Sequence, residues 1–204
     1  MEVLKQNSPQ MSADKRRSEA RTACQFAAMA LLAVGVVCAQ MIQPDSPLPQ
    51  IKGMSLEDRE VTLPDAAAGK AALLIITFSK AAGEHARAWN DRFLQDYPQD
   101  DKATSYSVAM LEDVPSLFRG MVRSGIKRGI PAALRSRFVT VVKDEAQWKQ
   151  YVGVKEDKDP YLLLLDRSGH VSWKYQGRFD QKIYDILKTK IAELITPSAK
   201  SQAR

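Results

Sequence analysis

The sequence predicts an α/β fold, a three-layer sandwich in which helices flank a central mixed β-sheet. Two continuous apolar runs, at residues 71–78 and 161–165, are typical of buried strands. Segments with helical spacing of apolar residues lie between the predicted strands, and a hairpin with a terminal helix closes the chain. The 204 residues are 45% hydrophobic and 26% charged, which is an ordinary globular composition for one domain.

The local patterns justify each element in turn. Alternating or continuous apolar residues predict strands, apolar residues at three- and four-residue spacing predict helices, and proline or glycine marks the ends. In chain order we expect a strand pair over residues 51–63, a buried strand over 71–78, a helix from Ala82 to Tyr97, a strand over 106–110, a helix that starts at Asp113-Val114-Pro115, a strand over 138–142, a short helix over 145–151, a hairpin over 161–175, and a last helix over 180–195.

Residues 1–39 have the three parts of a secretory signal peptide. A basic segment precedes an uncharged apolar run over residues 23–37, and Val37-Cys38-Ala39 provides a cleavage pattern before Gln40. The run is shorter than the roughly 20 residues that span a bilayer. We therefore expect an exported protein, periplasmic or secreted, with an N-terminal membrane anchor or a mitochondrial location as alternatives.

The rest of the chain divides simply. We expect a Pro-rich linker over residues 40–48, one domain over residues 49–195 and a flexible tail over residues 196–204. Met1 and Met11 both remain possible starts, and the oligomeric state is left open.

Both cysteines, Cys24 and Cys38, lie in the predicted leader. Cleavage before Gln40 would leave a product without a thiol, whereas disulfide exchange and peroxide reduction need one. On this reasoning we expect a protein that is not a thiol-disulfide oxidoreductase or peroxidase, and not an enzyme. If the leader is retained, Cys38 would instead serve a membrane-anchored thiol protein.

Two segments resemble the thioredoxin-like superfamily, in its peroxiredoxin and TlpA-type branch. Residues 49–63 resemble the opening hairpin of that branch, and residues 159–169 resemble the segment that holds its cis-proline, next strand and hairpin turn. The resemblance implies a thioredoxin-like sandwich over about residues 49–195, with a cis peptide bond at Pro160. Shorter stretches, residues 78–83 and 161–173, are similar to mitochondrial ATP-synthase assembly factors of the thioredoxin-like type.

Redox members of this superfamily carry cysteine where the first core strand meets its helix, and this chain does not. The former active-site position holds Ala82, Gly83, Glu84 and His85, together with Pro160. One hypothesis is cysteine-free acid–base chemistry at Glu84 and His85, which requires the side chains to converge near the segment before Pro160. Neighbouring helical residues point about 100° apart, so a solvated first turn is the alternative.

The segment from Val114 to Val142 contains no acidic residue, and its basic residues form the candidate partner-binding surface. The first three follow each other at four-residue spacing, so they share one helix face, which we expect opposite Phe118 and Val122. An acidic protein surface or an anionic lipid would suit them, and a solvated basic face is the alternative. The six basic residues are Arg119, Arg123, Lys127, Arg128, Arg135 and Arg137.

The sequence thus favours a non-redox binding or assembly factor, chaperone-like, for a protein partner. No cofactor and no metal site are expected, because phosphate-binding loops and clustered ligand residues do not occur in the sequence. Nucleic acid is not expected as a partner, because aromatic residues do not interleave with the basic ones.

Overall fold

The computed structural model of the chain describes residues 46–98 and 101–196. The predicted signal peptide (residues 1–39) and all but the first residue of the predicted tail lie outside the described residues. The strands are β1 (Ser46–Pro47), β2 (Ile51–Ser55), β3 (Glu60–Leu63), β4 (Ala71–Thr77), β5 (Ala103–Met110), β6 (Phe138–Val141), β7 (Tyr161–Leu165) and β8 (His170–Gln176). The helices are α2 (Lys80–Asp96), α3 (Ser116–Gly129), α4 (Glu145–Val152) and α5 (Gln181–Ile195), with short 3₁₀ turns η1 (Asp65–Ala67) and η2 (Ala132–Arg137).

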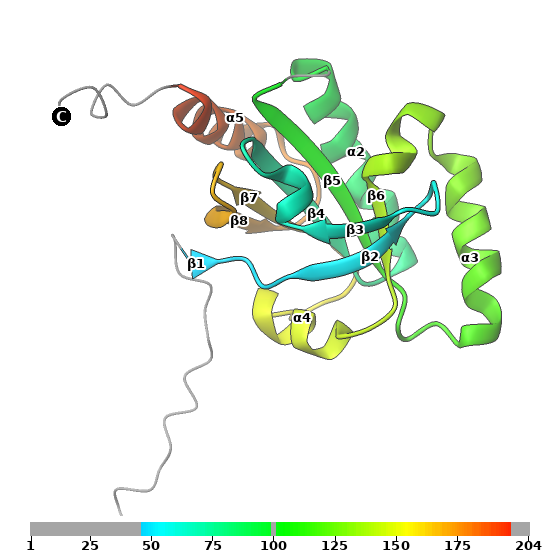
Figure 1. The fold of residues 1–204 in the computed structure, drawn as a ribbon. Coiled ribbons are helices and arrows are strands. Elements are labelled where there is room, and N and C mark those ends of the chain that lie inside the picture. Colours follow the sequence, from blue (N-terminus) through cyan, green and yellow to red (C-terminus); the bar gives the residue numbers. More distant parts are fainter. Residues whose placement is uncertain (1–45, 99–100, 197–204) are drawn as a thin grey trace, which may run out of the picture. The chain divides into compact units, whose positions relative to one another are not determined.

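The strands form one mixed sheet in the order β1-β8-β7-β4-β5-β6-β2-β3. The pairs β4–β5 and β5–β6 are parallel, and the other neighbours are antiparallel. Only residues 48–50 separate β1 from β2, although these strands stand near opposite ends of the order, so the sheet is strongly curled (Figure 1). The predicted α/β sandwich is confirmed.

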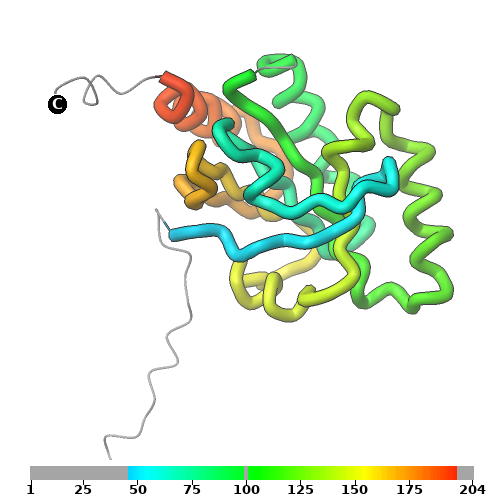
Figure 2. Tube along the Cα trace, in the orientation of Figure 1, coloured from blue at the N-terminus to red at the C-terminus, as the bar shows by residue number. Residues whose placement is uncertain are grey.

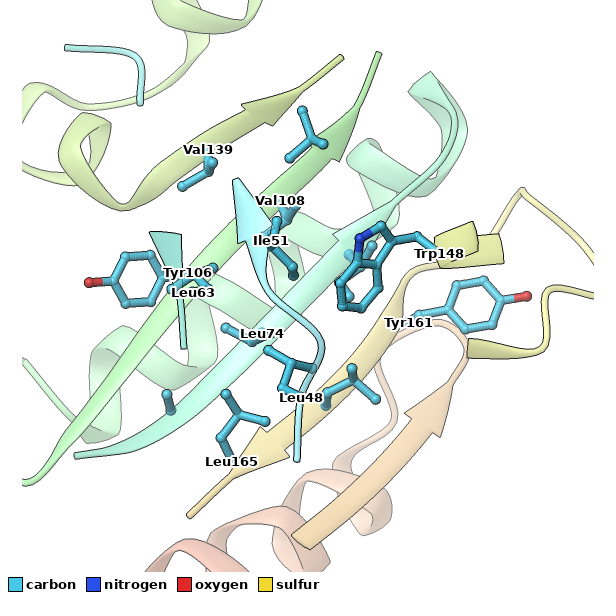
Figure 3. Close-up of a cluster of buried hydrophobic side chains, with 14 of the residues drawn as sticks. Leu48, Ile51, Leu63, Leu74, Tyr106, Val108, Val139, Trp148, Tyr161 and Leu165 are labelled. Atoms are coloured by element: carbon cyan, nitrogen blue, oxygen red, sulfur yellow. The ribbon is translucent and has the colours of Figure 1, made fainter. Parts of the chain in front are cut away.

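The two faces of the sheet bury two separate cores, because successive strand residues point to opposite sides. On one side Leu73 and Ile75 of β4 pack with Trp89 of α2 and with α5. On the other side Leu74 of β4 packs with Trp148 of α4 and with β2 and β3 (Figure 3). All seven residues of β4 are buried, as the apolar run predicts.

Three details differ from the expectations. Within the segment expected to be a linker, Ser46 and Pro47 form β1 and pair with β8, and Leu48 is buried in the core. The helix α3 begins at Ser116, and Asp113 does not cap it. The prediction of a cis bond at Pro160 is wrong: among the described residues, the cis bond precedes Pro64.

Pro160 has a structural role, because it extends the pairing of β7 with β8. It is buried directly before β7, and its carbonyl accepts a hydrogen bond from the amide of Gly177, at 3.1 Å. This bond continues the pairing of β7 with β8 by one residue. Within the described part of the chain, no helix is both long enough and apolar enough to cross a membrane.

Candidate functional site

The junction between β4 and α2 is tied to the loop before β7. Ser79 caps α2, and its hydroxyl accepts a hydrogen bond from the amide of Ala82 at 3.1 Å. The same hydroxyl donates to the carbonyl of Asp157 at 2.6 Å. The start of α2 and the segment before Pro160 therefore lie side by side, where the sequence placed the former active-site position.

His85 is the residue of that position whose side chain meets a carboxylate. Its Nδ1 lies 3.1 Å from Oδ1 of Asp159 and 3.0 Å from the carbonyl oxygen of Lys158. A carbonyl can only accept, so Nδ1 carries the hydrogen in this arrangement and Nε2 is the ring nitrogen left to take up a proton. Arg178 approaches the same carboxylate, with Nε 3.5 Å from Oδ1.

The other residues of the former active-site position do not join His85. The carboxylate of Glu84 lies 3.8 Å from Nζ of Lys80, and both side chains are exposed. Ala82 is buried in α2, and the amide of Gly83 donates to the carbonyl of Ser79. The predicted pair of Glu84 and His85 is thus replaced by His85 and Asp159.

Asp159 was missed by reasoning from the sequence, although a signal for it existed. It immediately precedes Pro160, and the resemblance placed that proline opposite the start of α2. Two hollows of about 60 and 30 Å³ lie elsewhere, one beside Pro64 and Gly169 and one beside Asn90 and Leu134. In residues 46–98 and 101–196 no group of three or more histidine, cysteine or acidic side chains is arranged to hold a metal ion.

The helix α3 presents a second candidate surface, because none of its residues is buried. Leu117 is 85% exposed, Met121 71% and Phe118 49%. We call these three residues the apolar face. The regular spacing of apolar residues predicted the helix, but these large side chains do not enter a core. Figures 1 and 2 show α3 beside the turn that joins β2 to β3.

The basic stripe of α3 lies against that turn. The guanidinium of Arg123 donates to Oδ1 of Asp58 at 2.7 Å and to the carbonyl of Ser55. Nζ of Lys127 lies 3.5 Å from Oδ2 of the same aspartate. The hydrogen bond from Arg123 and its positive charge hold the pKa of Asp58 below its ordinary value of 3.8.

The remaining basic residues of the candidate surface are also engaged, with one exception. Arg119 donates to the carbonyls of Val114 and Glu112, both at 2.8 Å. Arg135 donates to the carbonyl of its own turn at Ile130, and Arg137 reaches the hydroxyl of Thr104 at 3.5 Å. In the part of the chain that the structure describes, Arg128 is the member of the set without such a partner. Most of the predicted partner-binding cations therefore hold α3 and its flanks in place.

A buried carboxylate fixes the entrance to α3. Glu145, 2% exposed, accepts hydrogen bonds from the amides of Glu112 and Asp113, at 3.1 and 3.4 Å. The ammonium group of Lys149 lies 2.8 Å from Glu145 and 2.7 Å from Asp113. Hydrogen bonding to Lys149 lowers the pKa of Asp113, and the reciprocal bond raises the pKa of Lys149. Asp113, where the sequence predicted the helix to start, instead belongs to this network.

Known proteins share this fold. A candidate protein disulfide isomerase from Bacteroides thetaiotaomicron matches with a TM-score of 0.56 and 12% identity, over 76% of this chain and 91% of that one. The thioredoxin domain of a thiol-disulfide oxidoreductase from Bacteroides vulgatus matches with a TM-score of 0.53 and 18% identity, over 73% and 98%. BsSco, a member of the Sco family of cytochrome c oxidase assembly proteins, matches with 0.53 and 12%, over 78% and 100%.

These matches define the class: the chain has a thioredoxin-like fold, as the resemblance in the sequence implied. At identities of 12–18% they establish the fold alone. No protein-family model and no curated protein matches the sequence.

The matches also correct one expectation. Structures that share the fold include a thiol-disulfide oxidoreductase and a candidate disulfide isomerase, so the fold is one that thiol enzymes use. The expectation that this chain is not an enzyme is therefore corrected, because its fold is one on which thiol enzymes are built. It depended on the positions of Cys24 and Cys38, which lie outside the described residues.

Proposed function

We propose that this protein binds another protein through the apolar face of α3 and acts as an assembly factor for it. The observation that carries the proposal is the exposure of Leu117, Phe118 and Met121 on a helix that buries no residue. Burying a large apolar side chain is worth roughly 1.5–3 kcal/mol. A helix that leaves three of them in water has that stabilisation available for a partner.

The contacts of α3 support this role, because they fix which face points outward. Arg123 and Lys127 both pair with Asp58, so the basic side of the helix is held against the turn between β2 and β3. The network around Glu145 fixes the chain just before the helix begins. A surface held in one orientation loses less entropy on binding than a mobile one.

Site-specific crosslinking tests this proposal. A photoreactive amino acid replaces Met121 in the full chain expressed in its own host, and a matched variant carries it at Ile186, which is 48% exposed on α5. We expect a defined adduct with one other polypeptide from position 121, lost when Leu117 is changed to Gln, and no such adduct from position 186. Equal adducts from both positions, or none from position 121, would refute the role of α3.

A second candidate function is acid–base chemistry at His85, which its contact with Asp159 favours. The carboxylate fixes the orientation of the ring and, as the acceptor for Nδ1–H, favours attack by the lone pair of Nε2. The rate at which diethyl pyrocarbonate modifies His85 measures that nucleophilicity, with His170 as an internal control. We expect Asp159→Asn to slow the modification of His85 severalfold and to leave His170 unchanged. Equal rates in both proteins would remove this candidate.

Export belongs to the proposal as well, and it is supported by the pattern of residues 1–39. The mass and N-terminal sequence of the protein from its host test it directly. A chain that begins at Gln40 would support export with cleavage. A chain that retains Cys38 would refute it and favour a membrane-anchored thiol protein.

A further inference from the structure

We propose that the segment bound by the apolar face is an acidic amphipathic helix of the partner protein. This inference rests on the proposed function of α3 and adds the chemistry of the bound segment. It is carried by two independent observations, the charge around the apolar face and the glycines within α3.

The charge near the apolar face is positive and not balanced. Residues 114–142 contain no carboxylate, so the cations of α3 depend on other parts of the chain. Asp58 faces Arg123 and Lys127, but Arg128 is exposed and has no partner within the described residues. It follows Leu117 by eleven residues, three turns along the same side of the helix.

A second cation lies beside Gly129, the residue that follows Arg128. Arg87 of α2 is exposed, and its guanidinium lies 3.0 Å from the position that a Cβ on Gly129 would take. Arg87, like Arg128, has no acidic partner within the described residues. An apolar surface bordered by two guanidinium groups at one end is complementary to an apolar segment that carries carboxylates at the matching end.

The glycines of α3 indicate that the bound segment approaches closely. Gly120 and Gly125 are in helical conformation, and a Cβ at either position would meet no atom within 4 Å. Glycine weakens a helix relative to alanine, and no contact among the described residues requires it at these positions. Gly125 follows Met121 by one turn, so it continues the apolar face. A missing side chain there lets the backbone of a packed helix come near.

Two other occupants fit these observations less well. A second copy of the chain would bring an identical acid-free face, so that Arg128 would meet either its own counterpart or an apolar residue. A bilayer surface attracts helices through many free basic residues, whereas the other cations of α3 are tied to Asp58 or to backbone carbonyls. The acidic helix satisfies both the charge and the close approach.

The test uses the full chain and two synthetic probes. One fluorescent peptide of about 18 residues is an amphipathic helix with leucine on one face and glutamate beside it, and the other has lysine in place of every glutamate. Binding is followed by fluorescence anisotropy at low salt. We expect the glutamate peptide to bind at least roughly tenfold more tightly than the lysine peptide.

Three variants assign the binding to named features. We expect Arg87→Glu with Arg128→Glu to abolish or reverse the preference for the glutamate peptide. We expect Leu117→Gln with Met121→Gln to weaken both peptides. The matched control, Ile186→Gln with Lys182→Glu on α5, should leave both affinities unchanged.

Gly125→Gln tests the close approach separately. A Cβ at this position meets no atom of the described residues within 4 Å, and glutamine is a better helix former than glycine, so we expect the domain to stay folded. We expect it to weaken the glutamate peptide by roughly fivefold or more, because a bulky side chain at an interface prevents packing. An unchanged affinity would overturn helix packing at this position.

The outcomes separate this inference from the proposed function. Equal binding of the two peptides would overturn the acidic helix, while a crosslink at Met121 would keep the docking role of α3. Binding to anionic vesicles that depends on Leu117 would overturn the inference in favour of a membrane, and an α3-dependent dimer in sedimentation would overturn it in favour of a second copy. Loss of both the crosslink and the peptide binding would remove both proposals.

Discussion

The substitution Glu145→Gln tests the claim that a buried carboxylate holds the entrance to α3. Glutamine has the shape of glutamate, so the packing around it is preserved. One oxygen of Glu145 accepts from the amides of Glu112 and Asp113, and the other faces the ammonium of Lys149. Glutamine has one oxygen, so its amide nitrogen must point at donors on one of these two sides.

The size of the effect follows from these contacts. Hydrogen bonds that involve a charged group contribute about 1.5–3 kcal/mol when they are buried, and Glu145 is 2% exposed. We therefore expect Glu145→Gln to lower the free energy of unfolding by about 1.5–3 kcal/mol. For a domain of this size, each kcal/mol lowers the melting temperature by about 2–4 °C, so a decrease of about 3–12 °C is expected.

The assay is thermal and urea unfolding followed by circular dichroism. Glu193→Gln is the matched control, because Glu193 pairs with Lys190 on the exposed side of α5 at 2.9 Å and such surface pairs contribute about 0–1 kcal/mol. A double-mutant cycle with Lys149→Met isolates the coupling between the two side chains.

An unfolding temperature for Glu145→Gln within about 1 °C of the control would refute the stabilising contribution of Glu145, given the expected shift. A coupling energy near zero between Glu145 and Lys149 would refute the contribution of that ion pair. The destabilisation would then come from the hydrogen bonds that the amides of Glu112 and Asp113 donate to Glu145. A normal melting temperature together with lost peptide binding would show that the network orients α3 without stabilising the fold.

Three further predictions concern the anchoring of α3, its response to acid and the core. Asp58→Asn should speed amide exchange in α3 without lowering the melting temperature, because asparagine tolerates the left-handed backbone of this residue (φ 65°). The control Glu57→Gln should leave the exchange rates unchanged. The pKa values of Asp58 and Asp113 lie below 3.8 in the folded protein, so the two carboxylates stabilise the anchoring of α3 fully above that pH. This stabilisation is lost as the pH falls through the lower, folded-state pKa values, and amide exchange of α3 between pH 5 and pH 2 measures the loss. Leu164→Ala, at a fully buried position of β7, should cost about 2–5 kcal/mol in urea unfolding, and a cost below 1 kcal/mol would contradict the described core.

The central strands, unlike the short β1, could be predicted from the sequence because burial produces both the apolar runs and the strands. The apolar runs of β4 and β7 are continuous because helices or other strands cover both faces of the sheet there. The helix α2 was also predictable, since Ala82, Ala86, Trp89 and Phe93 recur at its buried face. In these elements local pattern and burial agree.

The orientation of α3 could not be predicted in this way. Apolar spacing indicates a helix, but it does not say whether the apolar side meets the domain or the solvent. Here Asp58, more than fifty residues earlier in the chain, pairs with Arg123 and turns the basic side inward. Charge pairing between distant residues leaves no periodic signal, so both the engaged stripe and the exposed Leu117 and Met121 needed the structure.

The candidate site was predictable in part. His85 followed from its place at the start of α2, but its partner is Asp159 rather than the neighbouring Glu84. The contact joins residues 74 positions apart and depends on how the loop before β7 closes over α2. Pro160 was misjudged because the isomer of a peptide bond depends on the surrounding fold as well as on the residue type.

The order of the strands has a consequence for the behaviour of the protein at high concentration. An unpaired outer strand invites another chain to add to the sheet, which is a common route to aggregation. Here the outermost strands are β1, of two residues, one of them the proline Pro47, and β3, of four residues starting with Glu60. The edge strands are short, Pro47 has no amide hydrogen to donate, and Glu60 places a charge on the edge. A strand of another molecule therefore finds few backbone groups to pair with, and we expect the protein to resist edge-to-edge aggregation.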